Sequence, residues 1–198
     1  QNQVYIIAGY TNYRNKKELN SALAINDKGK VVVDYNKVHL VTGLESVFTP
    51  GEEIGLFKMQ DLQLGISICK DLDFQGYIRK YGIGDADILI IPAWDFRVDD
   101  WLHSRMSILR GVENGFSEIR AAREGRLTMS DCFGRVNYES SCSGGQKATL
   151  VGNISLIKVN TIYTRFGDWF GILVLTAAFS FMLLLLRNKI RSNETKSL

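Results

Sequence analysis

LQLGISICKDLD, residues 62–73, is the stretch of sequence that decides the fold. A nearly continuous apolar run leads to Cys69, and the chain then changes at once to the charged residues Lys70, Asp71 and Asp73. Such a run is typical of a strand that is buried on both faces of a sheet. In α/β folds, the side chains that follow a buried strand lie at the carboxyl edge of the sheet, where functional sites are built. The stretch therefore predicts an α/β fold with Cys69 at a sheet edge.

The segments around this strand follow strand and helix patterns in turn. A hairpin is predicted where two apolar segments flank the turn Asn-Asp-Lys-Gly-Lys, because its glycine tolerates a positive φ. Strands that alternate with crossover helices and are followed by hairpins indicate sheets covered by helices. The predicted strands are 4–10, 21–25, 31–35, 53–59, 62–69, 87–92, 118–122, 126–130, 136–139 and 147–157, and the predicted helices are 74–81 and 99–114.

The predicted helix 99–114 has clear end signals. Asp99 and Asp100 suit the positive end of a helix dipole, and Gly115 suits the stop. Apolar residues recur along it at spacings of three and four, which predicts a single buried face. The residues of that face are Leu102, Met106, Leu109, Val112 and Phe116.

Charge and cysteine content exclude several classes of protein. Beyond Leu186 there are four basic residues and one acidic residue, which accounts for the whole net charge of +3. The neutral remainder argues against a nucleic-acid partner, which would need a basic face. The three cysteines match no zinc spacing and no disulfide framework, so we expect no metal and no cofactor. A bond between Cys132 and Cys142 stays possible if that region lies outside the cytoplasm.

An apolar segment near the C-terminus predicts a membrane span. Residues Trp169–Leu186, WFGILVLTAAFSFMLLLL, contain no charge. As a helix they would be roughly 27 Å long, close to the bilayer hydrocarbon core of about 30 Å. A buried core helix is the alternative, but such a helix is rarely closed by a cluster like Arg187, Lys189 and Arg191. These charges predict a cytoplasmic C-terminus, with the preceding domain on the other side of the membrane.

Two residues are the first candidates for chemistry. Cys69 at a strand end can act as a thiolate nucleophile, although a cysteine in a core strand is also simply a small apolar residue. Lys37, within YNKVHLV (35–41), can stabilise an oxyanion, although a solvated lysine at a strand end is the commoner case. His39 and His103 are interpreted as packing or cleft-lining residues.

Five stretches occur in the order found in the carbon–nitrogen hydrolase (nitrilase) superfamily, and the chain resembles that superfamily over nearly its whole length. The resemblance implies an αββα sandwich in which Cys69 forms a thioester, Lys37 stabilises the oxyanion and Glu45 supports the lysine. The stretches are YNKVHLV (35–41) followed by Glu45, LGISIC (64–69), DILIIPAW (87–94), HSRMSILRGVENGFSEIRAA (103–122) and SDCFGRV (130–136).

The segment RFGDW (165–169), which leads into the apolar run, is similar to the apolipoprotein N-acyltransferases of that superfamily. This resemblance implies transfer of a fatty acyl group from a membrane phospholipid, through a cysteine thioester, to the N-terminal amine of a lipoprotein. It implies the outer face of the bacterial cytoplasmic membrane as the place of reaction. The alternatives are a membrane-tethered amidase or nitrilase-type hydrolase and a non-catalytic remnant of the fold.

The chain departs from the acyltransferase pattern in three places. Lys70 and Asp71 replace Tyr and Glu after the cysteine, and Thr42-Gly43-Leu44 replaces Pro-Phe-Gly before Glu45. The general-base glutamate of the superfamily lies upstream of the segment that begins here, so we expect these residues alone to have little or no activity. The expected organisation is a partial hydrolase domain over 1–160, a linker over 161–168, a membrane helix over 169–186 and a basic cytoplasmic tail over 187–198.

Overall fold

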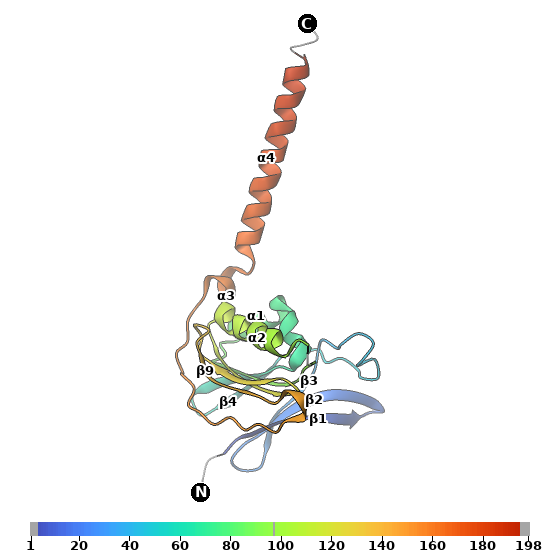
Figure 1. Ribbon diagram of the computed structural model, residues 1–198, viewed down its shortest axis with the longest axis vertical. Coiled ribbons are helices and arrows are strands. Elements are labelled where there is room, and N and C mark those ends of the chain that lie inside the picture. Colours follow the sequence, from blue (N-terminus) through green and yellow to red (C-terminus); the bar gives the residue numbers. More distant parts are fainter. Residues whose placement is uncertain (1–3, 97, 195–198) are drawn as a thin grey trace. The chain divides into compact units, whose positions relative to one another are not determined.

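The computed structural model describes residues 4–96 and 98–194. Contacts within the chain divide it into two units, Gln1–Arg165 and Phe166–Leu198, which we describe separately. In the first unit the described residues form a three-stranded sheet and a six-stranded sheet, and two helices cover the outer face of the larger sheet (Figure 1). The predicted αββα type of sandwich is confirmed in its helix, sheet and sheet layers.

The smaller sheet is antiparallel, with β2 at its centre. It consists of β1 (Ile6–Arg14), β2 (Lys17–Ile25) and β3 (Val31–Asn36). The β2–β3 hairpin was predicted, whereas the β1–β2 hairpin was not. Its turn residues, Asn15 and Lys16, both have positive φ values, 53° and 63°, without the glycine that would have indicated a tight turn in the sequence.

The larger sheet has a parallel centre and antiparallel edges. Its strands β5, β6 and β7 are parallel, and α1 and α2 form the two crossover connections between them. The elements are β4 (Gly55–Met59), β5 (Leu62–Ile66), α1 (Gln75–Ile83), β6 (Ile88–Trp94), α2 (Asp100–Asn114), β7 (Ser117–Arg123), β8 (Arg126–Ser130) and β9 (Val136–Ser141).

Alternate residues of the parallel strands supply two separate cores. Leu64 and Ile66 of β5 pack between the sheets, while Leu89 and Ile91 of β6 pack beneath the helices. On the helix side β5 has Gly65, where an added Cβ would come within 2.7 Å of the Tyr81 ring. The two-sided burial explains the continuous apolar runs in the sequence.

Three predictions about strands are corrected. β5 ends at Ile66, before the predicted Cys69, because the chain turns into a 3₁₀ helix there. β6 continues through Pro92, which is tolerated because β5 pairs with β6 only as far as Ile90 and leaves that side of the strand without a ladder. Residues 147–157 form no strand or helix, and Ile154 packs against the core between the sheets.

The predicted buried face of α2 is also corrected. Leu102, Leu109 and Val112 are exposed, while Phe116 is buried as predicted. The helix instead turns small and polar side chains towards the sheet, and Ser107 Oγ donates a 2.6 Å hydrogen bond to buried Glu118 of β7. Small residues allow the helix to approach the sheet closely. The helix forms where it was predicted, but a different side of it is buried. The buried residues of α2 are Ser104, Ser107, Ile108, Arg110, Gly111 and Asn114.

The second unit contains the long helix α4 (Trp169–Glu194). Its stretch Trp169–Asn188 is long and apolar enough to cross a membrane, judged by length and composition. The segment 161–168, expected as a linker, contains the short helix α3 (Ile162–Phe166). Of the predicted basic tail, residues 195–198 lie outside the described part of the chain.

Candidate active site

Cys69 begins the 3₁₀ helix η1 (Cys69–Asp73), which follows β5. Its φ of +44° is in the left-handed region, which a residue with a Cβ enters at a cost of about 1–3 kcal/mol. Its thiol Sγ lies 3.6 Å from the carbonyl oxygen of Trp94 at the end of β6. This sharp turn presents the cysteine at the carboxyl edge of the parallel strands, as the sequence predicted.

Asp71 is the centre of a hydrogen-bond network behind Cys69. Its fully buried carboxylate accepts hydrogen bonds from Tyr35 Oη at 2.6 Å, the His39 backbone N–H at 2.8 Å and the Ile68 backbone N–H at 3.0 Å. The His39 ring lies 3.1 Å from the same carboxylate. Asp71 therefore joins the end of β3 to the turn that carries Cys69. The sequence showed this aspartate only as a departure from a family pattern.

Lys37 follows β3 and is only 2% exposed. Its Nζ donates a 2.7 Å hydrogen bond to Glu45 Oε2, and Glu45 also accepts from the Val41 backbone N–H at 2.6 Å and from Asn20 Nδ2 at 2.7 Å. Burial by itself would raise the pKa of Glu45, but the hydrogen bonds from Lys37 and Val41 outweigh it, so the pKa is lowered. The pair is a fixed lysine ammonium and glutamate carboxylate.

Cys69, Lys37 and Glu45 all line one cleft of about 780 Å³. The structure thus brings together the three residues that the sequence singled out. Burial raises the pKa of the Cys69 thiol, with Lys37 opposing this effect. A thiol of this kind needs a proton acceptor before it can act as a nucleophile near neutral pH.

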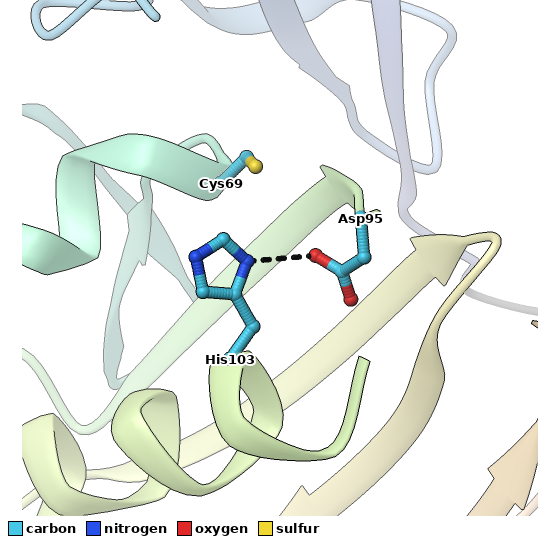
Figure 2. A group of neighbouring side chains, drawn as sticks. All are labelled: Cys69, Asp95 and His103. Carbon is cyan, nitrogen blue, oxygen red and sulfur yellow. Dashed lines mark hydrogen bonds and ion pairs between the residues drawn. The ribbon is translucent and has the colours of Figure 1, made fainter. Parts of the chain in front are cut away.

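A further cluster beside Cys69 was not predicted from the sequence (Figure 2). Asp95, just after β6, is 2% exposed and accepts a 2.6 Å hydrogen bond from Arg120 Nη2. Its Oδ1 also lies 3.2 Å from Nδ1 of His103 on α2. Cys69 Sγ, a His103 ring nitrogen and an Asp95 carboxylate oxygen all lie within 4.8 Å of one another. Asp95 and His103 are eight residues apart, on either side of the β6–α2 connection, whereas Cys69 lies in an earlier turn that the fold places beside them.

Sulfur, nitrogen and oxygen atoms this close together are also a possible donor set for a metal ion. The position of Arg120 argues against that use, because its guanidinium already binds and neutralises the Asp95 carboxylate. Burial would raise the pKa of Asp95, but hydrogen bonds from His103 and Arg120 lower it overall. The cluster is therefore poorly suited to holding a second cation.

The two other cysteines lie outside this cleft. Cys132 and Cys142 are buried free thiols and do not form the bond that the sequence left possible.

Known proteins resemble the chain in both sequence and fold. It is 28% identical to the apolipoprotein N-acyltransferase of Geobacter metallireducens over 177 residues, covering 78% of this chain and 34% of that protein. It is 31% identical to the 2-oxoglutaramate amidase of Bacillus subtilis over 116 residues, covering 56% of this chain and 44% of that protein. An amidase from Nesterenkonia sp. AN1 has a similar fold, with a TM-score of 0.65 and 18% identity over 71% of this chain and 58% of that one.

The chain spans 34% of the length of the first of these sequence relatives and 44% of the length of the second. The similarity nevertheless covers the cleft, because the carbon–nitrogen hydrolase family model matches residues 1–157. That match extends over most of the chain, from the strands of the smaller sheet to the segment that follows β9. The chain therefore belongs to the carbon–nitrogen hydrolase family.

Proposed function

We propose that this chain is part of a membrane-anchored N-acyltransferase, in which Cys69 carries a fatty acyl group as a thioester. The observation that carries the proposal is the strained turn that exposes Cys69 to a cleft shared with buried Lys37. The similarity to apolipoprotein N-acyltransferases and the apolar helix α4 support it. We propose a phospholipid as the acyl donor and the N-terminal amine of a lipoprotein as the acceptor.

The proposed reaction has two steps. The Cys69 thiolate attacks the ester carbon of the phospholipid, and Lys37 Nζ stabilises the oxyanion that forms. The carbon–oxygen ester bond then breaks, and the lysophospholipid alkoxide leaves with the proton that a general base, by resemblance the superfamily's upstream glutamate, had taken from the cysteine; this gives the thioester. In the second step the acceptor amine attacks the thioester, loses a proton and expels the thiolate, which leaves an amide on the acceptor. Glu45 is proposed to hold Lys37 in place through its 2.7 Å hydrogen bond.

The lining of the cleft is compatible with an acyl chain. Apolar and aromatic residues line the same cleft as Cys69, and apolar lining of this kind favours a hydrocarbon ligand. The residues concerned are Val41, Leu44, Phe48, Trp94 and Phe96.

For the membrane arrangement we propose residues 169–186 as the span and 187–198 as a cytoplasmic tail, with the catalytic domain (1–160) and the segment 161–168 on the outer face of a bacterial cytoplasmic membrane. The basic residues that follow Leu186 support this orientation. A reporter fused after Leu198 that is active only outside the cytoplasm should remain inactive. An active reporter would reverse the proposed orientation.

The second candidate function is hydrolysis, in which water rather than an amine attacks the thioester. Relatives named as amidases favour it, among them the 2-oxoglutaramate amidase. In the structure of the Nesterenkonia amidase, the acetamide moiety of fluoroacetamide is covalently added at the active-site cysteine. Both candidates would pass through a thioester at Cys69, and they differ in the acyl donor and in the group, amine or water, that attacks the thioester.

Trapping of the acyl-enzyme tests the proposal. Membranes that contain the full-length protein, or its Cys69→Ala variant, are incubated with an alkyne-tagged phospholipid, and hydroxylamine-sensitive label on the protein is measured. We expect label on the wild type and none on the variant. No label on a folded wild type would reject the phospholipid acyltransferase and favour an amidase or a non-catalytic relative.

A further inference from the structure

Trp94 and Arg123 occupy paired positions at the carboxyl ends of two neighbouring parallel strands, β6 and β7. Paired residues of adjacent strands have their side chains on the same face of the sheet, so these two side chains meet. The Arg123 guanidinium carbon lies 4.1 Å from the centroid of the Trp94 ring. A guanidinium stacked in this way is held by one of its faces, while the N–H donors at its edge stay available to a ligand.

The backbone around Trp94 connects this stack to the turn that carries the cysteine. Cys69 Sγ lies 3.6 Å from the Trp94 carbonyl oxygen. The next residue, Asp95, donates a 2.9 Å hydrogen bond from its backbone N–H to the Arg123 carbonyl oxygen. Cys69, Trp94 and Arg123 all line the same cleft. A ligand that reacts at Cys69 therefore shares its cleft with the Arg123 guanidinium.

Arg123 differs from the two lysines that line this cleft, because its positive charge has no partner. Lys37 is paired with Glu45, and Lys70 is paired with Asp73. The Arg123 side chain is exposed, and it makes no ion pair or side-chain hydrogen bond with any residue that the structure describes. Its stack on an aromatic ring thus presents an uncompensated cation to the cleft.

A phosphate group suits this cation in the proposed acyl donor. A guanidinium can form two parallel hydrogen bonds to a phosphate or a carboxylate. In a phospholipid the phosphate and the acyl ester are attached to the same glycerol, so an ester carbon at Cys69 has the phosphate only a few bonds away. The apolar residues of the cleft favour a lipid over a small amide that carries a carboxylate. Asp99 also lines the cleft, beyond ion-pair distance from Arg123.

We propose that Arg123, held on the Trp94 ring, binds the phosphate of the phospholipid donor and so places the ester carbon at Cys69. This inference deepens the proposed function and rests on it. Lys37 stabilises charge that develops at the reacting carbon, whereas the phosphate carries the same charge before and after the reaction. Loss of Arg123 should therefore raise the donor concentration needed for half-maximal labelling of Cys69 and leave the maximal rate nearly unchanged.

The test is protection of Cys69 against iodoacetamide, which requires no acyl transfer. The full-length protein in a neutral detergent is mixed with lysophosphatidylethanolamine, or with the monoacylglycerol of the same chain, which lacks the phosphate. Alkylation of the peptide that contains Cys69 is then quantified by mass spectrometry. In the wild type we expect the lysophospholipid to protect at about a tenfold lower concentration, the scale of one charge-assisted contact. In Arg123→Gln we expect both lipids to protect at the same concentration.

Lys58→Gln is the matched control, because it removes one exposed positive charge from β4, outside the cleft. This variant should keep the preference for the lysophospholipid. A preference that persists in Arg123→Gln, or its absence from the wild type, would overturn the inference. Equal protection by inorganic phosphate alone would also overturn it, since Arg123 would then bind a free anion rather than a lipid headgroup.

Two further results separate this inference from the proposed function. Protection by 2-oxoglutaramate that depends on Arg123, without protection by the lysophospholipid, would overturn the phosphate site and favour the amidase. If the lysophospholipid preference depends on Arg123 but the alkyne-tagged phospholipid leaves no label on Cys69, the phosphate site is supported and acyl transfer is rejected.

Discussion

Asp71 joins the segment that carries Lys37 to the turn that carries Cys69. In Asp71→Asn, an amide N–H₂ replaces one carboxylate oxygen, so at least one buried donor loses its acceptor. We expect the free energy of unfolding to fall by about 1–3 kcal/mol, together with the rate of Cys69 labelling. Tyr35→Phe is the milder comparison, because it removes a single donor from the same carboxylate. Thermal unfolding of the detergent-solubilised protein measures the difference, and equal stability of Asp71→Asn and wild type would contradict it.

Glu45 provides a prediction about pH. Its pKa is lower in the folded protein than in the unfolded chain, so the unfolded state binds more protons when the pH falls. The stabilisation by Glu45 is therefore fully present above the pKa of this carboxyl in the unfolded chain, about 4.3. It is lost as the pH decreases through the lower pKa of the folded protein. In Glu45→Gln, which cannot titrate, we expect the stability to decline less steeply below pH 4.5. The unfolding midpoints of wild type and Glu45→Gln are measured from pH 3 to pH 7, and parallel curves for the two proteins would contradict this expectation.

The sequence indicated some individual residues of the site and not others, for a physical reason. Cys69 and Lys37 each stand at the end of an apolar strand, where a change from apolar to charged residues is visible locally. Asp95, His103 and Arg120 have no such local signal, since a histidine near a helix start is usually structural. Their relation depends on how α2 crosses the sheet, and that is set by packing.

Among the elements, α2 gives a paired prediction. Ile108 is 6% exposed and Leu109 is 49% exposed, although both are large and apolar and adjacent. Ile108→Ala is expected to lower the free energy of unfolding by about 2–5 kcal/mol, because it creates a cavity. Leu109→Ala should change it by less than about 1 kcal/mol. Similar losses of unfolding free energy for both variants would indicate that α2 buries the face that its apolar spacing predicted.

The same helix shows what limits prediction of elements from this sequence. The bounds of α2 follow from local signals, acidic residues at one end and Gly115 at the other. Its buried side depends instead on Glu118 of β7, which needs the Ser107 hydroxyl as a partner. Residues 147–157 have a strand-like composition, but they pair with no described strand, because β-pairing depends on a neighbour that a single segment cannot specify.

For the whole molecule, the apolar helix α4 gives a prediction that tests whether it anchors the protein in a membrane. Arginine near the centre of a spanning helix costs about 2.5–3.5 kcal/mol on insertion scales. A Leu175→Arg, Phe179→Arg double variant should therefore pass from the carbonate-resistant membrane fraction into the extract. Thr176→Ser with Ser180→Ala is the matched control and should stay in the membrane. Retention of the double arginine variant would mean that α4 alone does not anchor the protein.

The positive φ of Cys69 has a consequence for any search for more stable forms of this protein. Glycine adopts that backbone conformation without strain, so Cys69→Gly is expected to melt at a higher temperature than Cys69→Ala. A library selected only for heat tolerance would then enrich sequences that have lost the sulfur atom. Screens for stable variants should therefore include a thiol-dependent readout in every round. At this position the positive φ lowers stability and at the same time presents the thiol to the cleft.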